Sequence, residues 1–145
     1  MTYAAFWKRF VALVIDSICI NIISFILGFI TGMVLGIAGN AAGMARDTIM
    51  QAAGAAGYAE GIIVFFLYYS LFESSAKQAT IGKMALGVKV TDTEGNRLSF
   101  GKALLRAFGK LISLIIFGLG CLVAAFTEKK QALHDFIAKT LVVNA

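Results

Sequence analysis

Long runs of apolar residues dominate the first part of the chain. The run Phe10–Ala38 contains a single charged residue, Asp16. It is longer than the about 20 apolar residues that span a bilayer, so it predicts an uncleaved transmembrane helix over residues 10–36. A cleaved signal peptide would have a shorter apolar core, about 7–15 residues, without an acid in it.

A second apolar run, centred on Ile62–Phe72, predicts another transmembrane helix over residues 55–73. Glu60 and Glu73 then fall near its two ends, and we interpret Glu60 as a solvated interfacial acid. The Ala- and Gly-rich stretch Gly39–Gly57 precedes this helix, and its composition fits either a loop or a helical extension.

A third apolar block, Leu111–Phe126, is short for a membrane span. Its sixteen residues give about 24 Å of helix, against a hydrocarbon core of about 30 Å. Gly118 and Gly120 interrupt it. We expect a kinked or re-entrant element over residues 111–126 that returns the tail to the cytoplasm, whereas a straight third span would export the tail.

Basic residues are distributed unevenly between the two segments that flank the second span. Ser74–Lys110 carries seven of them, and Gly39–Gly57 carries one. Because basic loops stay cytoplasmic, we expect the N-terminus and residues 74–110 inside and the first loop outside.

The cytoplasmic segment contains signals for short elements. Thr80 is placed to cap a turn of helix. The alternation from Val88 to Phe100 on both sides of a turn predicts a β-hairpin. Since an isolated hairpin is marginal in water, we expect Thr140–Val143 to join it as a third strand. Its partner would be either Val88–Thr91 or Arg97–Phe100.

The end of this segment, Phe100–Lys110, has the spacing of an amphipathic helix that suits the membrane surface. One face carries the basic side chains Lys102, Arg106 and Lys110, and the other carries Leu104, Phe108 and Leu111.

Composition agrees with the membrane interpretation. The chain has 145 residues, of which 59% are hydrophobic and 14% charged, whereas soluble domains carry about 25% charged residues. Cys19, Cys121 and His134 show no ligand-type spacing, so we expect no disulfide, metal site or cofactor. The sequence offers no nucleophile–base pair, and we expect neither an enzyme nor a nucleic-acid-binding protein.

Asp16 is the strongest candidate for chemistry. A carboxylate at mid-bilayer costs about 2.5–3.5 kcal/mol unless a partner relieves it. In one interpretation Asp16 binds a cation or shuttles a proton, with Asn21 as a further ligand and Glu73 on the inner leaflet. In the other, Asp16 belongs to a permanent structural ion pair with Arg9, Lys83, Arg106 or Lys110.

Several stretches resemble the RDD family, small prokaryotic membrane proteins named for one arginine and two aspartates. The resemblance implies that Arg9 is the arginine, Asp16 the first aspartate and Asp135 the second, with Asp92 as the fallback. The stretches that carry it are Phe6–Asp16, Thr80–Val90, Gly95, Leu105–Arg106 and Ala132–Thr140.

Asp135 receives two different interpretations. Spacing alone makes it a surface residue that forms an i,i+4 ion pair with Lys139. The resemblance instead implies that its side chain turns inward, toward Arg106 or Lys83.

Together these patterns predict an all-α integral membrane protein with a single domain over residues 1–145. It would have two full transmembrane helices, a Gly-broken third element and a small cytoplasmic β-hairpin or three-stranded sheet. We expect a multi-pass protein of the prokaryotic plasma (inner) membrane, with the lipid bilayer as one partner. One copy is too small to enclose a pore comfortably, so we expect a homo-oligomer or a partner membrane subunit.

The resemblance implies transport as the activity. We expect a transporter that exchanges a monovalent cation for protons through Asp16, with Arg9, Asp135 and Glu73 shaping the site. The alternative is a non-transporting membrane scaffold or assembly factor, in which the buried charges are structural.

Overall fold

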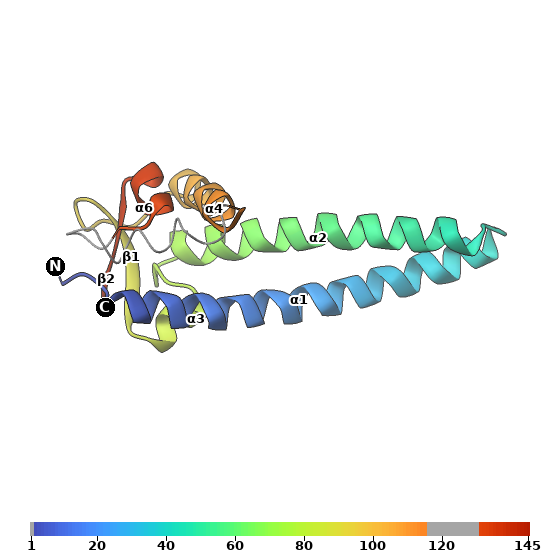
Figure 1. Ribbon diagram of the computed structural model, residues 1–145, viewed down its shortest axis with the longest axis horizontal. Helices are drawn as coiled ribbons and strands as arrows, with labels where there is room; N and C mark the ends of the chain where they lie inside the picture. Colours follow the sequence, from blue (N-terminus) through green and yellow to red (C-terminus); the bar gives the residue numbers. More distant parts are fainter. Residues whose placement is uncertain (1, 116–130) are drawn as a thin grey trace. The chain divides into compact units, whose positions relative to one another are not determined.

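The structure is a computed structural model that describes residues 2–115 and 131–145. Its described elements form two compact units. The hairpin unit is Ile18–Phe65, and the head unit combines Met1–Ser17 with Phe66–Ala145. The elements are α1 (Phe6–Ala41), α2 (Arg46–Ser74), α3 (Ile81–Ala85), β1 (Val88–Asp92), α4 (Phe100–Ile115), α6 (Leu133–Ala138) and β2 (Thr140–Asn144), as labelled in Figure 1.

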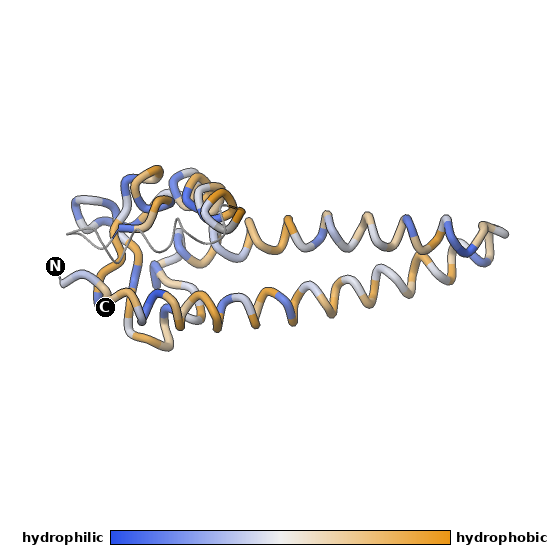
Figure 2. The backbone as a smooth tube through the Cα atoms, viewed as in Figure 1, coloured by the Kyte–Doolittle hydropathy of each residue, from blue (hydrophilic) through white to orange (hydrophobic). Residues whose placement is uncertain are grey.

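In the part of the chain that the structure describes, two helices are long and apolar enough to cross a membrane: α1, with 36 residues, and α2, with 29 residues. Apolar residues recur along the length of both (Figure 2). Large apolar side chains such as Phe25, Phe29 and Ile63 are exposed, which suits a helix surrounded by lipid.

The stretch Gly39–Gly57 is mostly helical. α1 continues to Ala41 and α2 already begins at Arg46, so a short connection joins them. The composition left this open, and the structure decides for the helical extension. Because α2 begins so early, Glu60 lies equally far from both ends of the helix.

In the head unit, β1 and β2 pair as an antiparallel two-stranded sheet, from Val88 opposite Asn144 to Asp92 opposite Thr140. Tyr3 forms an isolated bridge with Val143 on the other edge of β2. The alternating valines of the strands pack with Ala4 and Leu98 into a small core, whose members are Ala4, Val88, Val90, Leu98 and Val142.

The predicted β-hairpin is wrong, and so is the three-stranded sheet. Residues 97–99 form no strand, and α4 begins at Phe100. The Asp92 side chain accepts hydrogen bonds from the N–H groups of Glu94 (2.9 Å) and Asn96 (2.8 Å), which bends the chain away from β1. The free edge of β1 is satisfied instead by the Gln78 carbonyl, which accepts from Val90 N at 2.7 Å.

The helix predicted over Phe100–Lys110 exists and continues to Ile115 as α4. Its orientation differs from that of a membrane-surface helix, whose charged face meets water. Arg106 and Lys110 point into the head unit and are buried, whereas Leu105, Phe108 and Ile112 are exposed. The remainder of the predicted third element, residues 116–126, lies outside the described residues.

Candidate functional site

The centre of the head unit is a network of buried charges, and Asp135 is one of its two anions. Asp135 comes from the first turn of α6 and is completely buried. Its Oδ1 accepts from Arg106 Nη2 at 2.5 Å and Nε at 2.9 Å. Its Oδ2 pairs with Arg9 Nη1 at 2.5 Å and accepts from Ala132 N at 3.1 Å, which also satisfies the start of the helix.

Glu73, at the end of α2, is the second anion and is also completely buried. Its Oε1 accepts from Lys83 and, at 2.6 Å, from Lys110. Arg106 Nη1 lies 2.6 Å from its Oε2. The Lys110 ammonium also stacks over the Tyr69 ring, 3.3 Å from its centroid, which is a cation–π contact.

Arg106 connects the two anions and is itself fully buried. Burial works against its charge, but the adjacent Asp135 and Glu73 raise its pKa above the ordinary value. Burial alone would raise the pKa of Asp135, but Arg106, His134 and Arg9 hold it below the ordinary value. Both members of this pair therefore stay charged, which a buried ion pair requires in order to be stable.

The two lysines behave differently from Arg106. Burial lowers the pKa of Lys83, although Glu73 opposes the shift. Burial lowers the pKa of Lys110 further, again against the attraction of Glu73. Two ammonium groups on one carboxylate oxygen repel each other, so this is the part of the network in which a proton is held most weakly.

Asp16 lies in the head unit with its side chain buried. Three neutral groups donate to it: Tyr68 Oη at 2.8 Å, Thr80 Oγ1 at 2.6 Å and Gly82 N at 2.8 Å. The donors come from α2 and from the start of α3, so Asp16 joins these two helices to α1. Thr80 does precede α3 as its N-cap residue, but its hydroxyl contacts Asp16 and makes no side-chain cap.

Gly82 makes the approach of α3 to α1 possible. A Cβ atom at this position would lie 2.2 Å from the carbonyl oxygen of Ala12 and 2.9 Å from Asp16 Oδ1. Only a residue without a side chain leaves room for the backbone N–H to reach the carboxylate.

The residues predicted from sequence fall into three groups. Arg9, Arg106, Lys83, Glu73 and Asp135 are brought together in the charge network. Asp16 is fixed nearby by neutral donors, while its proposed ionic partners Arg9, Lys83, Arg106 and Lys110 contact Glu73 or Asp135. Asn21 belongs to the hairpin unit and its side chain is exposed.

The two interpretations of Asp135 are resolved by its burial. The surface ion pair with Lys139 is wrong, because Asp135 is completely buried and Lys139 is exposed. The fallback, Asp92, takes part in a turn at the surface, and its hydrogen bonds to Asn96 lower its pKa.

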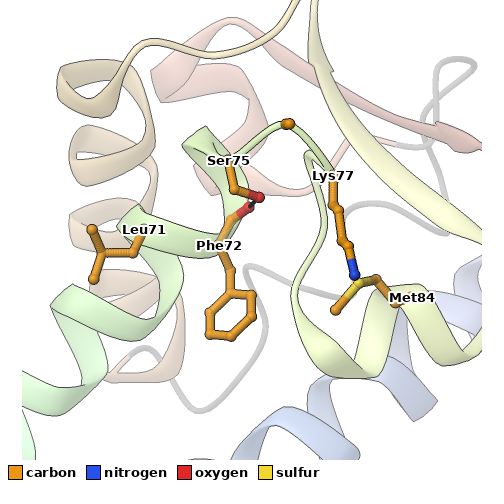
Figure 3. Close-up of a pocket in the computed structure, with 6 residues that line it drawn as sticks. Leu71, Phe72, Ser75, Lys77 and Met84 are labelled. Carbon is orange, nitrogen blue, oxygen red and sulfur yellow. Dashed lines mark hydrogen bonds between the residues drawn. The ribbon is translucent and has the colours of Figure 1, made fainter.

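Sequence reasoning missed Tyr68 and Thr80 as ligands of Asp16, and Tyr69 as a partner of Lys110. Tyr68 and Tyr69 lie within an apolar run, and the sequence of such a run does not say which side chains meet. A shallow depression of about 370 Å³ lies near the same helices, lined by Leu71, Phe72, Ser75, Ala76, Lys77 and Met84. In Figure 3 the Lys77 side chain extends toward Met84 along its wall.

Among residues 2–115 and 131–145, no three His, Cys, Asp or Glu side chains gather as they would around a metal ion. The described site is thus an ion-pair network built from lysine, arginine and carboxylate side chains.

Comparison with known proteins gives the family of the chain. The model of the RDD family matches residues 3–139. The chain belongs to the RDD family. The residues matched by the RDD family include both Arg9 in α1 and Asp135 in α6. Family membership and the two apolar helices together indicate a membrane protein.

The relatives of this RDD protein include two proteins of Bacillus subtilis. The "Uncharacterized protein YxaI" is 40% identical over 146 residues, which cover 97% of this chain and 96% of YxaI. The "Uncharacterized membrane protein YteJ" is 34% identical over 85 residues, 57% of this chain and 50% of YteJ. No solved structure matches the chain.

Proposed function

We propose that this RDD protein is a membrane scaffold or assembly factor whose head unit is fixed by buried ion pairs, and that it does not transport a solute. The observation that carries the proposal is Arg106, fully buried between Glu73 and Asp135. Together with Arg9, Lys83 and Lys110 it ties the ends of α1 and α2 to α3, α4 and α6.

Energetics favour a structural role for this network. Removing one partner of a buried ion pair costs about 3–5 kcal/mol, because the other charge is left buried and uncompensated. Each anion here accepts from two or more cationic groups, so neither is available for exchange with solvent. Asp16 is likewise saturated by Tyr68, Thr80 and Gly82, which removes the main argument for an ion-binding Asp16.

The hairpin unit has the dimensions of a membrane crossing. Its helical parts, residues 18–41 and 46–65, are about 36 and 30 Å long at 1.5 Å per residue. The hydrocarbon core of a bilayer is about 30 Å thick. We therefore propose that the hairpin unit crosses the plasma membrane of a prokaryotic cell.

The head unit is proposed to lie on the cytoplasmic side. It contains most of the basic residues, in agreement with the preference of such segments for the cytoplasm. Pairing of β1 with β2 and the bridge from Tyr3 to Val143 support a common side for the N-terminus, residues 88–92 and the tail. A common side favours the re-entrant or kinked alternative for residues 111–126, because that alternative returns the tail to the cytoplasm.

A second candidate function, exchange of a monovalent cation for protons, is favoured by one observation. Lys83 and Lys110 share one oxygen of Glu73, and burial lowers the pKa of both lysines. Loss of a proton from either lysine would leave Glu73 paired with the other and with Arg106, so a proton can leave without exposing a lone buried charge.

Flux measurements on the full chain in liposomes separate the two functions. A scaffold gives no pH-dependent sodium or potassium movement above that of empty liposomes. An exchanger gives such movement, and Lys110→Met abolishes it while the protein stays folded. For the scaffold we expect Lys110→Met and Asp16→Asn to change only the thermal stability in detergent, and cation-dependent proton flux by the wild type would overturn it.

A scaffold protein requires a binding partner. The exposed apolar faces of α1 and α2 leave room for a second copy or another membrane subunit, as expected from the sequence. Cross-linking in native membranes followed by mass spectrometry identifies which of these is present.

A further inference from the structure

The hairpin unit contains a carboxylate that the charge network does not use. Glu60, in the middle of α2, accepts a hydrogen bond from Thr31 Oγ1 of α1 at its Oε1. Its Oε2 is buried and has no hydrogen-bond partner among the residues that the structure describes. A Cβ atom at Gly28 would lie 3.9 Å from this oxygen, so Oε2 faces the bare backbone of α1.

The face of α1 toward Glu60 carries a second unused polar atom. Ser24, Gly28 and Thr31 follow one another at helical spacing, so they share one face of α1. Ser24 Oγ is buried and, within the described part of the chain, has no partner. This face thus holds two hydroxyl groups and a glycine in an otherwise apolar stretch.

Among residues 2–115 and 131–145, no basic side chain forms an ion pair with Glu60. The part of α1 in the hairpin unit, Ile18–Ala41, contains no Asp, Glu, Lys, Arg or His, and Cys19 is its one titratable residue. On α2, Arg46 and Asp47 lie at the far end of the helix, and Tyr58 is exposed to 81%. A carboxylate oxygen buried without a partner costs several kcal/mol, and more in lipid than in water.

We propose that Glu60 is a proton-binding site: it holds a proton on Oε2 and is a neutral acid within the membrane. This inference rests on the proposed crossing of the membrane by α1 and α2. A proton needs only the carboxyl group itself, whereas hard metal cations take about six or more oxygen ligands. The described surroundings offer two carboxyl oxygens and the hydroxyl group of Thr31, too few to replace the water around a metal ion.

Labelling with dicyclohexylcarbodiimide tests the site, because this apolar reagent adds to protonated carboxyl groups. The full chain is treated in liposomes at neutral pH, and the adduct is located by peptide mass spectrometry. We expect Glu60 to be labelled and Asp47, an exposed carboxylate of the same helix, to remain unlabelled. The adduct is lost in Glu60→Gln, which keeps the thermal stability of the wild type because an amide resembles the neutral acid.

Two further measurements make the outcome decisive. The infrared difference spectrum of wild type minus Glu60→Gln shows the carbonyl stretch of a protonated carboxyl group if the proposal holds, and a carboxylate band if it fails. If Glu60 binds a proton, the extent of its carbodiimide labelling is the same in sodium or lithium chloride as in choline chloride. Protection by sodium or lithium alone would overturn the proposal in favour of a metal cation.

Failure of this site is distinguishable from failure of the membrane proposal. Suppose that an impermeant maleimide labels Ala42→Cys only from outside the cell, while the carbodiimide does not label Glu60. This result overturns the proton site and leaves the membrane hairpin intact. Labelling of Ala42→Cys by the maleimide from the cytoplasmic side overturns both the proton site and the membrane hairpin.

Discussion

At the scale of the residue, the head unit is stabilised by buried carboxylates, each of which has hydrogen-bond or ion-pair partners. Asp135 and Glu73 are completely buried and each is paired with basic side chains, while Arg106 serves both. Asp16 is buried as well but accepts from neutral donors. Removing a charge from the network should therefore cost more than removing one from the surface.

Asp135→Asn should lower the free energy of unfolding by about 3–5 kcal/mol, because it leaves Arg9 and Arg106 facing an uncharged group in a buried site. The measurement is denaturant unfolding in detergent. Glu94→Gln, at an exposed acid of the same unit, is the matched control and should change the free energy by no more than about 0.5 kcal/mol. Equal effects of the two substitutions would contradict a structural role for the network.

His134 should make the head unit sensitive to mild acid. Burial lowers the pKa of His134 from 6.5 to about 3. Between these values the unfolded chain binds a proton that the folded chain does not, so the free energy of unfolding falls as the pH falls. The slope is at most about 1.4 kcal/mol per pH unit.

His134→Gln should flatten this dependence above pH 4.5, the ordinary pKa of a glutamate; Glu73 and Asp135, whose pKa values are held lower, add their own loss of stability only below that value. Unfolding curves of both proteins at a series of pH values give the comparison. Parallel pH profiles would show that His134 is not the group responsible.

At the scale of the element, α4 shows how a correct helix can have an unexpected orientation. Its amphipathic spacing is plain in the sequence, but spacing does not say whether the basic face meets water or buried carboxylates. Glu73 on α2 and Asp135 on α6 decide this, because both come from distant parts of the chain and both pair with Arg106. The apolar face then turns outward, and Phe108 packs against Phe66 of α2 with ring centroids 4.4 Å apart.

The contact of α3 with α1 should depend on Gly82. Gly82→Ala places a Cβ atom against the carbonyl oxygen of Ala12, and we expect a loss of about 1–3 kcal/mol in the free energy of unfolding. Gly101→Ala is the control, since no atom lies within 4 Å of a Cβ at that position of α4. It should leave stability unchanged or raise it by up to about 1 kcal/mol. A neutral Gly82→Ala would mean that α3 does not pack on α1 in the head unit.

At the scale of the whole molecule, one chain joins two units that suit different surroundings. The hairpin unit is mostly apolar and exposes large apolar side chains, while the head unit contains the sheet and the buried charges. A lipid environment for the first and a cytoplasmic one for the second would satisfy both, and this arrangement predicts the sidedness of the chain.

Cysteine accessibility tests the sidedness. In a chain with Cys19 and Cys121 replaced by alanine, Glu94→Cys should react with an impermeant maleimide only after the membrane is opened, whereas Ala42→Cys should react in intact cells. The loop after α1 and the turn after β1 serve as controls for each other. Reaction of both cysteines in intact cells would rule out a cytoplasmic head unit.

The sequence by itself determined the apolar helices, the family and the identity of the residues in the charge network. These follow from local properties: the length of an apolar run, the spacing of side chains, and short motifs such as the one that contains Arg9 and Asp16. It did not predict that Arg9 pairs with Asp135 or that neutral groups hold Asp16, and it left open which of two segments pairs with Thr140–Val143, which the structure shows to be Val88–Thr91. Those contacts join residues far apart in the chain, and only the tertiary structure decides which buried carboxylate each cation satisfies.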